Sequence, residues 1–123
     1  MASPSHEKIK EAVQDLLDAS PYVKAAAVIR VSGLAVEAIM PPYVEEERVS
    51  AMASVMLLLG ERITDAMQTG ELEKVYINGT KGHIVLMAIG KGAVLTVMAG
   101  EKAALGLLFV EMRQAIKKLR KLV

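Results

Sequence analysis

Apolar residues recur at three- and four-residue steps over three stretches of the chain, and this spacing predicts three helices. The longest covers residues 44–70, the first covers about 5–20 and the last about 103–122. Ser3 or Ser5 would cap the first helix, because a serine side chain can accept a hydrogen bond from the free amides of the first turn.

The predicted helix 44–70 is apolar around more of its circumference than a surface helix of a monomer needs. At 100° per residue its apolar positions span roughly 220°, about twice the width of an ordinary core-facing stripe. We interpret one stripe as facing the chain's own sheet and the adjoining one as facing a second copy of the chain; the alternative is a central helix buried within one monomer. The first stripe comprises Val49, Met52, Ala53, Met56, Leu59, Ile63 and Met67. The second comprises Ala51, Val55 and Leu58, with Arg48 and Arg62 at its ends. The remaining arc carries Ser50, Ser54, Glu61, Thr64, Asp65 and Gln68, with Leu57 as an apolar exception.

Five strands are predicted between the helices, at residues 23–29, 34–39, 71–78, 83–89 and 93–98. Glycine-containing turns join the first two strands and the last three, so neighbouring strands form hairpins and the sheet is antiparallel. The order is helix, two strands, long helix, three strands, helix, which is an α+β arrangement of a five-stranded sheet with helices on its faces. Strand 71–78 begins with polar residues, which is typical of an edge strand or one that pairs with a partner.

Length and composition favour a single domain spanning residues 1–123, without disulfides. The formal net charge is +1, so no strong overall field favours nucleic acid as a partner. Hydrophobic residues make up 53% of the chain but aromatic residues only 3%, which predicts an aliphatic core. No apolar run is long enough to span a membrane, and the first residues lack the apolar segment of a signal peptide. We therefore expect a cytoplasmic protein.

Residues able to carry catalysis are scarce. His6 and His83 lie far apart in the sequence, there is no cysteine, and no Gly-x-Ser-x-Gly motif occurs. The glycines at 90 and 92 join two strands instead of a strand and a helix, so they do not form a phosphate-binding loop. We expect no enzyme activity, no cofactor and no metal. Cations crowd the last helix from Arg113 onward, but the helix dipole alone favours cations there, so binding of a membrane surface or nucleic acid is the weaker interpretation.

Three segments resemble the roadblock family, the dynein light chain roadblock type. They are GLAVEAIMPPYVEEERVSAMASVMLLLGERI, GELEKVYINGTKGHIVLMAIGKGAVLTVMAG and KAALGLLFVEMRQAIKKL, and the resemblance covers about residues 7–119. Its most recognisable parts are the EER-x₃-M-x-S start of the long helix, the GELE strand entry, the GxKG hairpin and the Leu-Gly-Leu start of the last helix. The chain departs from the family at residues 30–32, where Arg-Val-Ser precedes a glycine that usually follows an acidic residue.

The resemblance implies a profilin-like α/β sandwich that forms a homodimer. Its long helices would lie side by side, and the strand after each would pair with its mate to extend the sheet. The implied interface residues are Ala51, Val55, Leu58, Arg62, Val75, Tyr76 and Ile77.

The resemblance also implies a non-enzymatic function. Family members regulate or scaffold small Ras-like GTPases, as in bacterial gliding polarity and the lysosomal Ragulator, or link cargo to dynein. A short, prokaryotic-looking chain favours the GTPase role. A structural adaptor in a motor or signalling assembly, and a small-molecule sensor of profilin type, are the alternatives.

Overall fold

The computed structural model describes residues 4–123 and contains the elements in the predicted order. Ser3, one of the two candidate caps of the first helix, lies outside the described residues. The elements are α1 (Pro4–Ala19), β1 (Val23–Arg30), β2 (Ala35–Ile39), α2 (Glu46–Ala66), β3 (Lys74–Gly79), β4 (Gly82–Ile89), β5 (Ala93–Gly100) and α3 (Leu105–Leu119).

The five strands form one sheet in the order β2-β1-β5-β4-β3, and every neighbouring pair is antiparallel. The three hairpins predicted from turn residues are all present. β5 lies at the centre and is buried along almost its whole length. β3 lies at one edge, as its polar start predicted, and β2 lies at the other.

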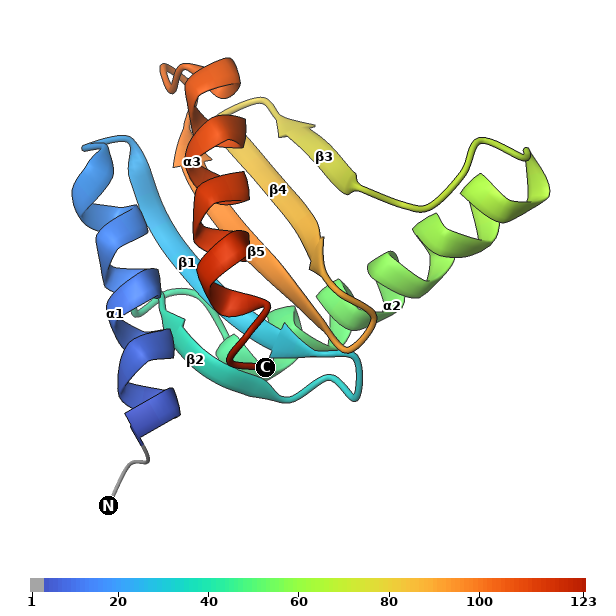
Figure 1. Ribbon diagram of the computed structural model, residues 1–123. Helices are drawn as coiled ribbons and strands as arrows, with labels where there is room; N and C mark the ends of the chain where they lie inside the picture. The colour runs from blue at the N-terminus through green and yellow to red at the C-terminus, as the bar shows by residue number, and fades with distance from the viewer. Residues whose placement is uncertain (1–3) are drawn as a thin grey trace.

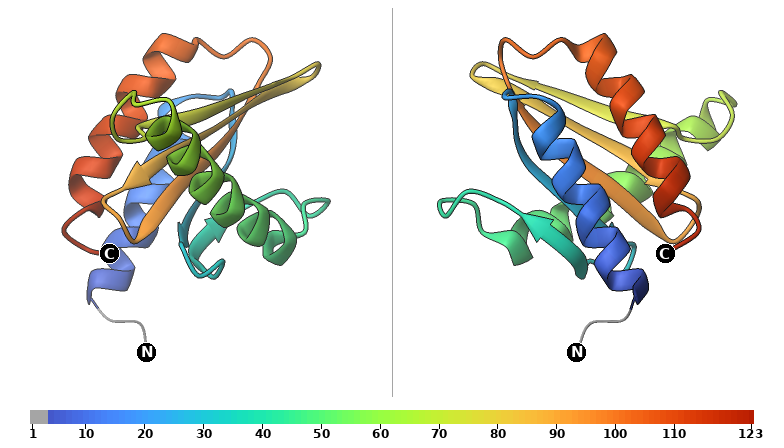
Figure 2. Two further views of the ribbon diagram at one scale, coloured as in Figure 1. Left: turned by 90° about the vertical axis from the view of Figure 1, so that its right-hand side faces the viewer. Right: turned by 60° about the vertical axis from the view of Figure 1, so that its left-hand side comes forward.

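Helices cover both faces of the sheet, but unequally (Figures 1 and 2). α1 and α3 lie together on one face, and the larger core cluster fills the space between them and the sheet. α2 alone crosses the other face, over a smaller cluster that includes Ala53, Leu57 and Leu86. The C-terminal part of α2 extends past the edge strand β3, and the chain then returns to begin that strand (Figure 1).

The long helix is shorter at its end than the sequence predicted. Gly70 was expected to close it, but α2 ends at Ala66, and the amide of Met67 donates to the carbonyl oxygen of Ile63 at 3.0 Å. The left-handed conformation that stops the helix is adopted by Gln68, with φ of 54°, and Gly70 belongs to the loop that follows. β3 accordingly begins at residue 74, three residues later than predicted.

Two positions inside the sheet have unusual surroundings: one is a close backbone contact and the other is a buried hydroxyl. A Cβ on Gly82 would lie 2.8 Å from the carbonyl oxygen of Ala99 in the neighbouring strand, so only glycine allows this close approach. Thr96, at the centre of β5, is buried, and its hydroxyl has no hydrogen-bond partner among the described residues.

Candidate functional site

The side of α2 that faces the sheet is not the one predicted. Ser50, Ala53 and Leu57 are the buried residues of this helix, and Leu57, the apolar exception in the predicted polar arc, is only 2% exposed. The hydroxyl of Ser50 donates to the carbonyl oxygen of Glu46 at 2.7 Å, so burying it leaves no unpaired donor. Small residues at 50 and 53, and a glycine at 60, let the helix backbone approach the sheet closely.

The prediction that the stripe of Met52, Leu59 and Ile63 faces the chain's own sheet is therefore wrong. All three side chains are about half exposed, and Met67 at the end of the stripe is 72% exposed. Only Ala53 of that stripe is fully buried, while Val49 and Met56 are partly buried. The helix is rotated so that Leu57 and two small residues face the sheet, while Met52, Leu59 and Ile63 do not.

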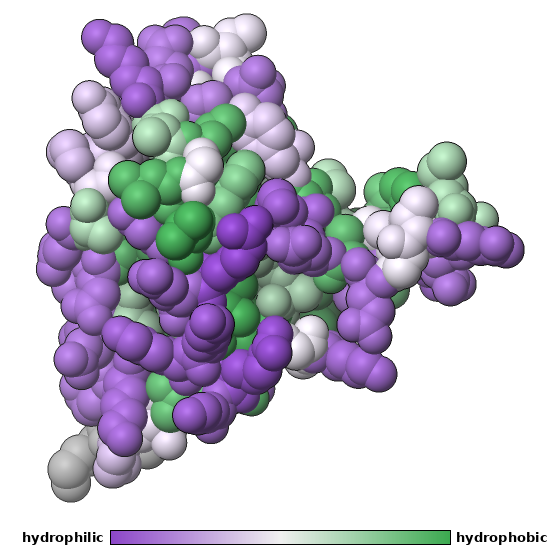
Figure 3. Space-filling view, turned by 45° about the horizontal axis from the view of Figure 1, so that its top comes forward, coloured by the Kyte–Doolittle hydropathy of each residue, from purple (hydrophilic) through white to green (hydrophobic). Residues whose placement is uncertain are grey.

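This rotation leaves a broad apolar surface on the side of α2 that points away from the sheet. We call this surface the outer face of α2. Its large side chains are all exposed, with Val55 at 65% and Leu58 at 53%. In Figure 3 the projecting end of the molecule, at the right, carries hydrophobic side chains beside hydrophilic ones. The outer face comprises Ala51, Met52, Val55, Leu58, Leu59, Arg62 and Ile63.

The seven predicted interface residues divide into three groups. Four of them, Ala51, Val55, Leu58 and Arg62, are exposed and lie on the outer face of α2. Val75 and Ile77 of β3 are partly buried against the core cluster beneath α2.

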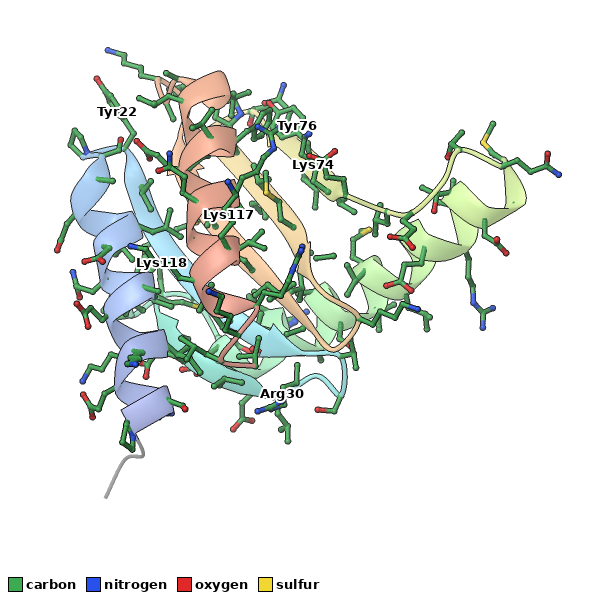
Figure 4. The ribbon with its side chains drawn as sticks, in the orientation of Figure 1. Tyr22, Arg30, Lys74, Tyr76, Lys117 and Lys118 are labelled. Atoms are coloured by element: carbon green, nitrogen blue, oxygen red, sulfur yellow. The ribbon has the colours of Figure 1, made fainter. Side chains whose placement is uncertain are left out.

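Tyr76, the third group, points to the opposite face of the sheet. Its hydroxyl lies 2.7 Å from Nδ1 of His83, and its ring meets Phe109 of α3 edge-on at 6.4 Å between centroids. Lys74, two residues earlier, lies 4.9 Å above the same phenylalanine ring, and Figure 4 shows both side chains on this strand. Side chains alternate along a strand, so residues 74 and 76 share one face while 75 and 77 share the other.

The turn between β1 and β2 adds residues that sequence reasoning missed. Val31 and Leu34 are exposed in this turn. The turn contacts α2, because the hydroxyl of Ser54 donates to the carbonyl oxygen of Val31 and a Cβ on Gly33 would lie 3.6 Å from the backbone of Ala51. An apolar residue in a turn signals nothing by itself, so only the fold shows that these two side chains border the outer face of α2.

Polar chemistry around these surfaces is sparse. Within residues 4–123, no three His, Asp or Glu side chains come together in a group that could hold a metal ion. His6 pairs with Glu37 at 3.1 Å, and His83 bonds to Tyr76 and to the carbonyl oxygen of Glu101, so the two histidines belong to different parts of the molecule. No helix of the described chain has the length and apolar character needed to cross a membrane.

An antiparallel five-stranded sheet with two helices on one face, and one long helix with an exposed apolar side on the other, is the α+β sandwich that the roadblock resemblance implies. Sequence comparison agrees, because the profile of the Roadblock/LC7 domain matches residues 9–99. The chain belongs to the Roadblock/LC7 domain family. The uncharacterized protein MJ1340 of Methanocaldococcus jannaschii is 31% identical over 104 residues, covering 85% of this chain and 90% of that protein.

Solved structures show the same fold. MglB of Myxococcus xanthus superimposes with a TM-score of 0.89 and 16% identity, over 98% of this chain and 91% of that one. A Roadblock/LC7 domain from Streptomyces avermitilis gives a TM-score of 0.85 and 21% identity, over 91% of this chain and 94% of that one. The predicted profilin-like α+β fold and the predicted family are thus confirmed.

Proposed function

We propose that this protein is a homodimeric, non-enzymatic regulator or scaffold of a small Ras-like GTPase. One observation carries the proposal: the outer face of α2 exposes a continuous set of large aliphatic side chains that the chain's own sheet does not cover. Large exposed apolar patches of this kind mark contacts with other proteins.

A second copy of the chain fits this surface for two reasons. α2 extends past β3, so its C-terminal part can lie over a neighbouring sheet (Figure 1). β3 pairs with β4 on one side only, and its other edge is free for antiparallel pairing with the same strand of a second copy. A twofold axis at this edge would join the two β3 strands and place the two α2 helices side by side.

This arrangement would give the predicted interface residues different roles. Val55 and Leu58 would bury their exposed surface against the mate, and Arg62 would lie at the rim. Val75 and Ile77 would contribute chiefly through the backbone of β3, since their side chains already contact the cluster beneath the chain's own α2. A permanent homodimer of this kind buries about 2,000 Å² or more in total.

The GTPase partner is supported by family membership and by the fold shared with MglB. The MglB of Thermus thermophilus, which has the same fold, is described as a gliding protein. The two α2 helices and the adjoining β1–β2 turns would form the surface that meets the partner. Val31 and Leu34 in each turn would then supply apolar contacts at its border.

A binding experiment with two nucleotide states tests this proposal. Ras-like GTPases encoded in the same genome are purified, loaded with GDP or with a non-hydrolysable GTP analogue, and titrated with the protein. We expect one nucleotide state to bind at least about tenfold more tightly, since a regulator must distinguish the two states. Equal binding of both states would make the protein a structural adaptor, and binding of neither would refute a GTPase partner.

A further inference from the structure

A groove of about 680 Å³ lies between α3 and the neighbouring end of the sheet. It is bounded by the C-terminal half of α3, the end of β4 and the segment 71–73 that leads into β3. Its apolar lining includes Leu72, Met87 and Ile116. None of its lining residues belongs to the outer face of α2.

Six charged side chains line this groove. Four are cations, and two, Glu71 and Glu73, are carboxylates. Arg113 and Lys117 come from α3, Arg120 follows its last residue, and Lys91 comes from the turn after β4. The first three of these cations lie three or four residues apart and so follow one side of the helix. A preference of cations for the helix C-terminus does not account for this set, because Lys91 belongs to another element and Arg113 lies in the middle of α3.

Most of this positive charge is available to a ligand. Nε of Arg113 lies 3.2 Å from Oε1 of Glu73, and the same oxygen forms an ion pair with Nζ of Lys74 at 3.7 Å. Lys91, Lys117 and Arg120 make no ion pair within the described part of the chain, and all three are exposed. Three unpaired cations beside an apolar lining are complementary to a chain that carries both carboxylates and an apolar side chain.

We propose that this groove binds an acidic peptide segment of a partner protein. The carboxylates of the segment would lie along Arg113, Lys117 and Arg120, and one apolar side chain would contact Ile116 and Leu72. Charge-assisted pairs with arginine suit carboxylates well, because the guanidinium can donate two parallel hydrogen bonds.

Other anionic ligands fit this groove less well. The cations are spread along a helix side and do not converge on one point, as the donors of a phosphate site do. A nucleic acid backbone carries no apolar side chain, so it would leave the apolar lining of Leu72, Met87 and Ile116 uncovered. The exposed apolar residues of α3, Leu107 and Val110, lie near its N-terminal end, so they cannot insert into a lipid layer that the groove cations contact.

Lysines 117 and 118 provide a matched pair for the test, because they are neighbours on α3 (Figure 4) but line different depressions. Lys118 faces a smaller depression toward α1. The probe is a short dye-labelled peptide of glutamates around a central leucine, and its binding to the whole protein is followed by fluorescence anisotropy at low salt. We expect Lys117→Glu to raise the dissociation constant about tenfold or more, and Lys118→Glu, which changes the net charge equally, to change it less than about twofold.

A variant that gains affinity strengthens the test. Glu73→Gln removes the carboxylate that pairs with Arg113, so the peptide should bind about threefold more tightly. Circular dichroism verifies that each variant is folded. The proposal is overturned if Lys118→Glu weakens binding as much as Lys117→Glu, which would indicate only bulk charge. It is also overturned if the peptide does not bind while phosphatidylserine vesicles or inorganic phosphate do, with the same dependence on Lys117.

Discussion

Replacing Leu58 tests the proposed dimer at the middle of the outer face of α2. Leu58 is 53% exposed in one chain, and burying a whole leucine side chain contributes about 1.5–3 kcal/mol. About half of that remains to be gained at the interface, so Leu58→Ala should cost about 1 kcal/mol per copy and about 2 kcal/mol per dimer. The dissociation constant of the dimer should then rise about thirtyfold. Leu58→Glu should have a larger effect, because it also places a carboxylate in a surface from which water is excluded.

Sedimentation equilibrium over a range of protein concentrations measures both effects. The unaltered protein should show twice the chain mass of 13.2 kDa, and Leu58→Glu should approach the mass of one chain. Leu107→Glu is the matched control, because Leu107 is 58% exposed but lies on α3, on the other side of the sheet. If Leu58→Glu keeps the dimer mass while remaining folded, the outer face of α2 is not the interface and our reasoning is refuted.

Three further predictions concern the free energy of unfolding, measured by urea denaturation. Each substitution is made in the Leu58→Glu variant, which we expect to be monomeric. Leu57→Ala should lower it by about 3 kcal/mol because it opens a cavity under α2, whereas Leu59→Ala should change it by less than about 1 kcal/mol; equal losses would mean that α2 is rotated differently. Gly82→Ala should lower it by about 2 kcal/mol because the new Cβ meets a backbone oxygen of β5, while Gly92→Ala, with open space around it, should leave it unchanged. Thr96→Val should raise it by about 1 kcal/mol because it removes a buried hydroxyl that has no hydrogen-bond partner among residues 4–123. A loss of stability would show that this hydroxyl is hydrogen-bonded.

Local sequence signals predicted the order of elements and the antiparallel sheet, because turn residues act at short range. Gly33 adopts the positive φ, 93°, that the first hairpin turn requires, and the turns around Gly79–Gly82 and Gly90 join neighbouring strands as expected. The polar start of the strand after α2 likewise identified an edge strand. These features depend on a few adjacent residues and not on what the chain folds against.

The orientation of α2 could not be predicted in the same way. Hydrophobicity ranks Met52 and Leu59 above Ser50 and Ala53, but the space between helix and sheet admits only small residues and Leu57 on that side. Periodicity measures where apolar residues occur, and on a helix with two apolar sides it does not tell which side meets the chain's own sheet. The excess apolar circumference was the informative feature, since it correctly indicated that one apolar side would remain uncovered.

Two features of the candidate site depend on contacts between distant parts of the chain. Tyr76 is a predicted interface residue by its position in β3, and its contacts with His83 and Phe109 show that its side chain lies on the face of the sheet that carries α3. Val31 and Leu34 border the outer face of α2 only because the β1–β2 turn packs beside that helix. No pattern along the sequence contains this information.

Cysteine cross-linking tests the central claim, that a second copy covers the outer face of α2, most directly. The chain contains no cysteine, so single cysteines introduced at Ala51, Val55, Leu58 or Arg62 report on contacts at one place only. A disulfide between two copies requires their Cα atoms to come within about 7 Å. We predict that mild oxidation joins two chains efficiently at one or more of these four positions, and not with a cysteine at Leu107 on α3. If no position on α2 cross-links faster than this control, the second copy does not cover α2.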